Sequence, residues 1–137
     1  MTEILKLAEE IVEAEDKKEQ IEPITGRIEI SVDEAYKIQR EVVRIKEKRG
    51  EKIVGKKIGL TNRAIQQAFG VEEPMSGYIT DKMVISEVKI DELIQPRIEA
   101  EIAFFLTNDL KSINRAEILE SIYAIPALEI VDSRIRD

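Results

Sequence analysis

The segment Arg97-Ile98-Glu99-Ala100-Glu101-Ile102 decides the fold of the second half of this chain, because acidic and apolar residues alternate along it. Successive side chains of a strand point to opposite faces, so Glu99 and Glu101 share one face. Two neighbouring carboxylates raise each other's cost of ionisation unless solvent or a cation relieves them. The pattern therefore predicts a strand over residues 97–106 with a candidate cation site on one face.

A third carboxylate, Glu129, interrupts the apolar run 125–131, which reads as a buried strand. If the two strands are neighbours, three carboxylates converge on one point and form a site for a hard cation, with Mg²⁺ or Mn²⁺ as the best fit. Spacing alone leaves two other readings open. Glu99 and Glu101 can lie on a solvated face with Arg97 as partner, and Glu129 can pair with an arginine farther along, Arg134 or Arg136.

The composition excludes several classes of chemistry and of partner. The 137 residues include no cysteine, histidine or tryptophan, so thiolate catalysis, Cys/His zinc sites and histidine acid–base chemistry are absent from this polypeptide. A net charge of −7, with basic residues interleaved among acids, argues against nucleic-acid binding. No apolar stretch is long enough to span a bilayer and no signal peptide is evident, so we expect a cytoplasmic protein without membrane contact.

Periodicity and capping signals predict an α+β fold with one helical and one mainly β region. The predicted regions are residues 1–50 and residues 51–137. Thr2 and Ser31 are available as N-caps of the first two helices, and Gly50 is the expected end of the second. The predicted elements are helices over residues 3–17, 31–50, 62–69 and 114–123, and strands over residues 53–60, 78–80, 84–88, 97–106 and 125–131.

Two adjacent lysines, Lys56 and Lys57, lie in an apolar, glycine-containing segment. Strand alternation sends one of them inward, where its pKa would fall and its ammonium group could bind a carboxylate or transfer a proton, but the pattern does not decide which. The aliphatic stem of either lysine can also lie on the sheet with its charge in water. Asp81 and Asp132 are acids beside strand ends, where turn formation is the ordinary role.

Several ordered motifs resemble the 2-keto-4-pentenoate hydratase and 4-oxalocrotonate decarboxylase family, within the fumarylacetoacetate hydrolase superfamily. The resemblance runs from about residue 30 to the end of the chain. It is carried by Ser31-Val32-Asp33-Glu34-Ala35-Tyr36-Lys37-Ile38-Gln39, Gly55-Lys56-Lys57-Ile58-Gly59-Leu60-Thr61, Glu73-Pro74 with Gly77, Gln95 to Ala103, and Pro126 to Ile135.

The resemblance implies a site and a reaction. It implies that Glu99, Glu101 and Glu129 are the ligands of Mg²⁺ or Mn²⁺, and that Lys57 is the active-site lysine. The metal would polarise the substrate's 2-oxo group, and Asp132 would orient Lys57 or a water. The implied function is hydration of 2-hydroxy or 2-oxo pentadienoates in the degradation of aromatic compounds, with 4-oxalocrotonate decarboxylation as the alternative.

Length is the departure from the family pattern. Members are considerably longer, and their second half supplies the rest of the β fold and part of the substrate pocket. We therefore expect this chain to be either a truncated or split gene product whose C-terminal portion is another polypeptide, or an expressed fragment, and we expect a homo-oligomer. A non-catalytic half-subunit that needs this partner is the third reading.

Overall fold

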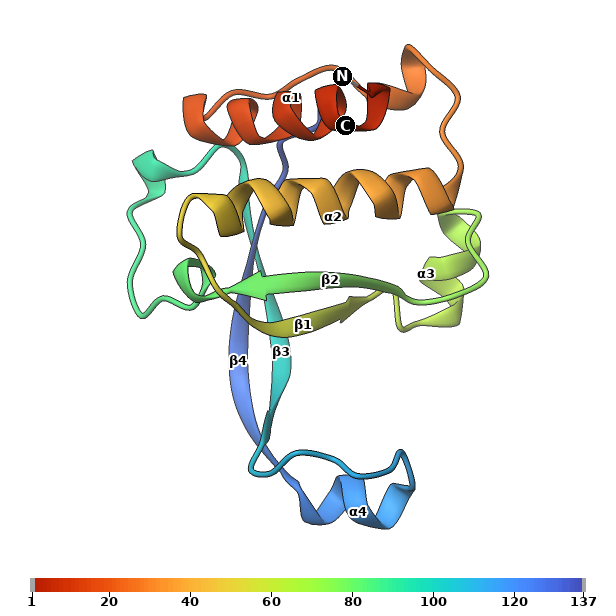
Figure 1. The fold of residues 1–137 in the computed structure, drawn as a ribbon, viewed down its shortest axis with the longest axis vertical. Helices are drawn as coiled ribbons and strands as arrows, with labels where there is room; N and C mark the ends of the chain where they lie inside the picture. Colours follow the sequence, from red (N-terminus) through yellow and green to blue (C-terminus); the bar gives the residue numbers. More distant parts are fainter. Residues whose placement is uncertain (1, 137) are drawn as a thin grey trace. The chain divides into compact units, whose positions relative to one another are not determined.

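The computed structural model describes residues 2–136, and within them four α-helices and four strands follow one another in the order given in Figure 1. The chain divides into two compact units, one of residues 1–92 and 134–137 and the other of residues 93–133. The boundary predicted at residue 50 lies inside the first unit, at the end of its second long helix. The division into residues 1–50 and 51–137 stays a prediction.

Two amphipathic helices, α1 (Glu3–Lys17) and α2 (Val32–Lys48), form the core of the first unit. Their apolar faces pack together around Leu7, Ala8 and Ile38, and the space-filling view shows the two helices in contact. Ser31 caps α2 with the predicted capping box, whereas Thr2 stands at the N-cap position of α1 without a side-chain hydrogen bond. Apolar burial thus holds this unit together.

Ion pairs add to the helix packing. Lys46 is buried in α2, and its ammonium group lies 2.6 Å from a carboxylate oxygen of Glu15 in α1. Arg134 contacts the other oxygen of the same carboxylate at 3.2 Å. A parallel bridge between Ile21 and Ile135 also ties the end of the chain to this unit. Because Lys46 is largely out of water, its carboxylate partner is required for its burial.

The first hairpin pairs β1 (Ile53–Gly59) with β2 (Met75–Thr80) in antiparallel register, with an irregularity between Ile53 and Gly55. The short helix α3 (Arg63–Ala68) connects the strands, and Asn62 caps it by accepting a hydrogen bond from the Ala64 amide. Lys57 stands opposite Gly77 in this hairpin, and Lys56 stands opposite Tyr78.

The second unit is a long hairpin of β3 (Pro96–Leu106) and β4 (Ile122–Asp132), paired antiparallel without a bulge. The helix α4 (Arg115–Glu120) lies in the connection and is capped by Asn114. The two acidic strands are thus neighbours, and Glu99 stands directly opposite Glu129.

Three expectations about these elements are wrong. Residues 84–88 form no strand, and Val84 and Ile85 are exposed there without a β partner. The helix predicted to reach residue 123 ends at Glu120, because Ile122 and Tyr123 pair with β3 instead. The strand over residues 125–131 is not buried, because Ile125 and Leu128 are exposed and Glu129 is half-buried.

The fold class itself is confirmed as α+β, with the N-terminal helices followed by the hairpins. Among residues 2–136, no helix combines the length and the apolar character that crossing a bilayer requires.

Candidate metal centre

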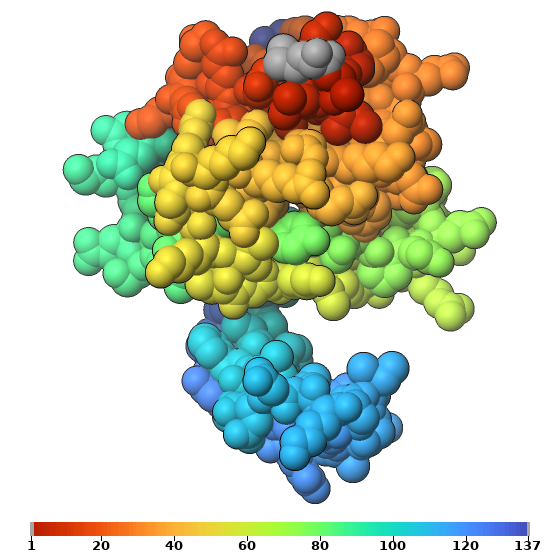
Figure 2. Space-filling view, viewed as in Figure 1, coloured from red at the N-terminus to blue at the C-terminus, as the bar shows by residue number. Residues whose placement is uncertain are grey.

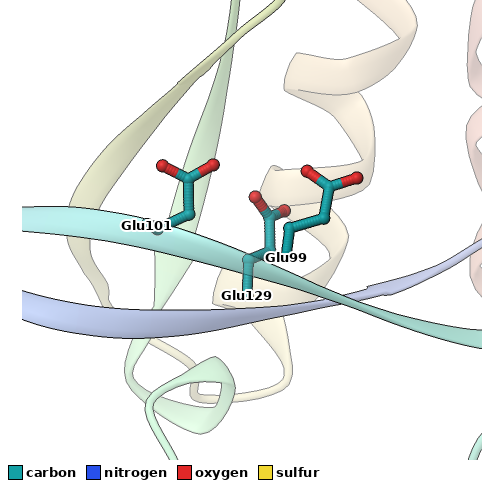
Figure 3. Close-up of side chains that lie close together, drawn as sticks. All are labelled: Glu99, Glu101 and Glu129. Carbon is teal, nitrogen blue, oxygen red and sulfur yellow. The ribbon is translucent and has the colours of Figure 1, made fainter.

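Three carboxylates meet on one face of the β3–β4 hairpin (Figure 3). Glu99 and Glu101 project from β3 on the same side, because they are two residues apart in a strand. Glu129 projects from β4 beside them, because the register places it opposite Glu99. One oxygen from each carboxylate lies within 4.8 Å of the other two. The convergence that the sequence only allowed is therefore present in the fold.

The spacing of these oxygens suits one hard cation. Opposite oxygen ligands lie about 4.2 Å apart across Mg²⁺ and up to about 5 Å apart across Ca²⁺. At most one of the three pairs can be opposite, so the other oxygens have to approach to about 3 Å, which rotation of the flexible glutamate side chains allows. Within the residues that the structure describes, this is the one group of three or more acidic side chains with such geometry.

The environment of the three glutamates is open. Glu99 and Glu101 are exposed, and Glu129 is half-buried. Water reduces the repulsion between exposed carboxylates, so the cluster does not need a cation for the chain to fold. An ion bound at such an open cluster would, however, keep coordination positions for the oxygens of a small ligand.

Asp132 lies at the end of β4, where its carboxylate binds the segment that leads into β3. It accepts hydrogen bonds from the backbone amides of Ile94, at 2.9 and 3.1 Å, and Gln95, at 2.7 Å. Asp132 therefore fixes the start of the strand that carries Glu99 and Glu101.

The two lysines of β1 have different surroundings. Lys56 is exposed, and its ammonium group lies 5.5 Å from the centre of the Tyr78 ring, within the range of a cation–π contact. Lys57 is half-buried and belongs to the first unit, whereas the three glutamates belong to the second. The inward lysine is thus Lys57.

Asp81 has a structural role at the end of β2. Its carboxylate accepts hydrogen bonds from the backbone amides of Lys52 at 2.9 Å and Lys82 at 3.1 Å. The bond from Lys52, more than any other contact, holds the pKa of this carboxyl below its usual value. The turn role expected from the sequence is confirmed.

Sequence reasoning missed the groups that surround Lys57. Tyr36 and Gln39 of α2 reach β2, where the Tyr36 hydroxyl accepts from the Ser76 amide at 3.1 Å and the Gln39 side chain donates to the Ser76 carbonyl at 3.0 Å. The available signal for these groups was a pair of polar residues three positions apart, beside the apolar stripe of the helix. It did not identify the strand that the pair binds.

Comparison with known proteins gives close relatives along the whole chain, although no family model matches it. The chain is 40% identical to a 2-hydroxypent-2,4-dienoate hydratase of Pseudomonas putida, over 99% of its own length and 65% of the relative's. It is 38% identical to a 4-oxalocrotonate decarboxylase of the same organism, over 96% of its own length and 53% of the relative's.

A solved structure of a 4-oxalocrotonate decarboxylase from Pseudomonas putida G7, complexed with magnesium and adipate, superposes with a TM-score of 0.90 at 36% identity. The match covers 100% of this chain and 56% of the decarboxylase. The chain thus spans about half to two thirds of the length of the relatives it matches.

Proposed function

Because the chain belongs to the family of 2-keto-4-pentenoate hydratases and 4-oxalocrotonate decarboxylases, of which it matches the N-terminal half, we propose that it is part of a metal-dependent lyase. Its substrates are small 2-hydroxy or 2-oxo dienoates from aromatic-compound degradation, and hydration is the leading reaction. The observation that carries the proposal is the convergence of Glu99, Glu101 and Glu129 on one face of a hairpin.

The proposed ligands of Mg²⁺ or Mn²⁺ are the three glutamates. Three carboxylates and no nitrogen or sulfur donor form the ligand set that these hard cations prefer. The magnesium complex of the similar decarboxylase supports the choice of ion. When bound, the cation supplies Lewis acidity that polarises a substrate carbonyl.

Lys57 and Asp132 have different proposed roles. The Lys57 ammonium binds the substrate carboxylate or holds the proton that the reaction moves, which suits the inward lysine of β1. Asp132 is a positioning residue: by accepting the amides of Ile94 and Gln95 it holds the start of β3, and with it the glutamates, in place. Its effect on catalysis is therefore indirect.

Decarboxylation is the second candidate. Two solved structures that superpose on the chain, with TM-scores of 0.90 and 0.87, are of a 4-oxalocrotonate decarboxylase. Hydratases, however, include the relative that is 40% identical over 99% of this chain. Both reactions stabilise negative charge on the same substrate oxygen, so one site can serve either.

A second polypeptide region completes the proposed enzyme. The face of the hairpin opposite the glutamates carries large apolar side chains, and Ile98 and Leu128 there are 71% and 72% exposed. We name this surface the apolar face and define it as Ile98, Ile102, Phe104, Leu106 and Leu128. So much exposed apolar surface marks an interaction site. A segment equivalent to the unmatched half of the relatives covers it, in a homo-oligomeric assembly located in the cytoplasm.

Turnover measurements test the proposal. The chain is assayed with Mg²⁺ on 2-hydroxypenta-2,4-dienoate and on 4-oxalocrotonate, alone and mixed with the unmatched half of the P. putida decarboxylase expressed separately. Hydration that requires Mg²⁺ and is lost in Glu101→Gln supports the leading reading. Release of CO₂ from 4-oxalocrotonate instead favours the decarboxylase.

The matched control is Glu120→Gln, which removes a carboxylate from α4 outside the cluster. It should keep the turnover of the unaltered chain. Absence of turnover from every mixture, with the second half shown to bind, would indicate the non-catalytic subunit.

A further inference from the structure

Lys57 lies across the one residue of β2 that has no side chain. Lys57 and Gly77 are direct partners in the β1–β2 ladder. A Cβ atom built on Gly77 would lie 3.0 Å from Cγ and 3.4 Å from Cδ of Lys57. Carbon atoms in favourable contact are about 3.5–4.0 Å apart, so even a methyl group at position 77 would displace the lysine stem.

The strand beneath Lys57 is held in place from the helix side. Both backbone groups of Ser76, the residue before Gly77, bind side chains of α2: Ser76 donates its amide to Tyr36, and its carbonyl accepts from Gln39. The Gln39 amide nitrogen would also lie 3.9 Å from a Cβ atom at position 77. Because β2 is anchored next to the contact, the Lys57 side chain has to move if position 77 gains a side chain.

The neighbouring pair of the ladder shows the opposite arrangement. Lys56 faces Tyr78, and its ammonium group lies over the aromatic ring. The two lysines of β1 therefore have contrasting cross-strand partners: a bulky aromatic residue opposite Lys56, and a glycine opposite Lys57. The tyrosine holds one ammonium group at the surface, and the glycine lets the other side chain cross the strand.

We propose that Gly77 is a positioning residue for Lys57, because the missing side chain leaves the path along which the lysine stem crosses β2 and presents its ammonium group to a substrate carboxylate. The inference rests on the substrate-binding role proposed for Lys57. The geometric part of it concerns the first unit alone and is testable without turnover.

A double-mutant cycle on the unfolding equilibrium tests the contact. Gly77→Ala should raise the unfolding equilibrium constant about threefold, because its Cβ atom would press on Cγ of the lysine stem. In the Lys57→Ala background, which lacks Cγ and Cδ, the same substitution should have little effect. Gly55→Ala is the matched control in the same hairpin, since its Cβ atom would meet Ile79 at an ordinary 3.8 Å. It should show no coupling to Lys57.

The functional readout is the KM for 2-hydroxypenta-2,4-dienoate in the turnover-competent protein. Gly77→Ala should raise KM about tenfold with the Mg²⁺ requirement unchanged, and the rise should vanish in the Lys57→Ala background. Absence of coupling in unfolding overturns the inference whatever the activity. Coupling in unfolding with an unchanged KM also overturns the positioning role. In that case the contact between Gly77 and Lys57 exists, and the substrate-binding role proposed for Lys57 is what has failed.

Discussion

The two units of this chain differ in the burial of their apolar side chains. In the first unit, α1 and α2 enclose a core in which Ala8 is fully buried, and every buried hydrophobic residue among residues 2–136 belongs to this unit. In the second unit, the β3–β4 hairpin leaves its apolar face open to solvent. The first unit therefore has its own source of stability, whereas the second relies mainly on strand pairing.

The same comparison explains where a site can form. One face of the hairpin is apolar, and the other carries the three carboxylates together with the stacked aromatic pair Phe105 and Tyr123, because side chains at odd and even positions point to opposite faces. A ligand or a second polypeptide that binds either face adds the contacts that the hairpin lacks. The region with the least internal packing is thus the region with the most to gain from binding.

The largest expected difference between the units comes from truncating one isoleucine in each. Ile38→Ala, in the core of the first unit, should lower the free energy of unfolding by about 2–4 kcal/mol, because it removes buried methylenes and leaves a cavity. Ile102→Ala, on the apolar face, should cost less than about 0.5 kcal/mol. Urea unfolding followed by circular dichroism measures both. A cost above that limit at Ile102 would mean that the apolar face is packed in solution.

Removing a helix cap should change the free energy of unfolding by a smaller amount, and again more in the first unit than in the second. Ser31→Ala should lower the free energy of unfolding by about 1 kcal/mol, because it removes the side-chain cap of a helix that packs in the core. Asn114→Ala removes the equivalent cap of the short helix α4 and should loosen that helix alone. Amide hydrogen exchange distinguishes the two results. Equal loss of protection in both units would contradict the proposed difference.

The smallest expected effect is on pH dependence. The Ser31 hydroxyl, followed by the Ser31 amide, holds the pKa of the Glu34 carboxyl below its ordinary value. The Glu34 carboxyl therefore binds a proton more readily in the unfolded chain than in the folded one. The stabilisation that ionised Glu34 gives the folded state is fully present above the ordinary glutamate pKa, and it is lost as the pH falls through the lowered pKa of the folded state. Glu34→Gln should flatten the decline in melting temperature between pH 6 and pH 3. Glu117→Gln removes the equivalent lowered pKa of the second unit and serves as its counterpart. A decline as steep in Glu34→Gln as in the unaltered chain would contradict this assignment.

The sequence predicted the elements whose signals are local. Capping residues and periodicity located α1 and α2, and alternation placed Glu99 and Glu101 on one face. Local signals also misled, because residues 84–88, with three β-branched apolar side chains, have the composition of a strand but no strand partner. Ile122 and Tyr123 continue a helical pattern, yet pairing with β3 draws them into β4.

The candidate site could be predicted only in part, because its geometry depends on contacts between distant segments. The pairing of Glu99 with Glu129 is a matter of register, which no spacing within either strand determines. The sequence likewise could not tell Lys56 from Lys57 by alternation. Their cross-strand partners, Tyr78 and Gly77, distinguish them once β1 and β2 are paired.

Binding of one ion among the three glutamates is the central proposal for this protein, and paramagnetic broadening by Mn²⁺ tests it. In a nitrogen-15 correlation spectrum, low concentrations of Mn²⁺ should broaden the amides around Glu99, Glu101 and Glu129 first, and excess Mg²⁺ should reverse the effect. In Glu101→Gln, at least about tenfold more Mn²⁺ should be needed for the same broadening, because one of the three ligands is lost. In Glu120→Gln, the Mn²⁺ concentration needed should not change. Broadening spread over the acidic surface of α1, or unchanged in Glu101→Gln, would contradict the metal centre.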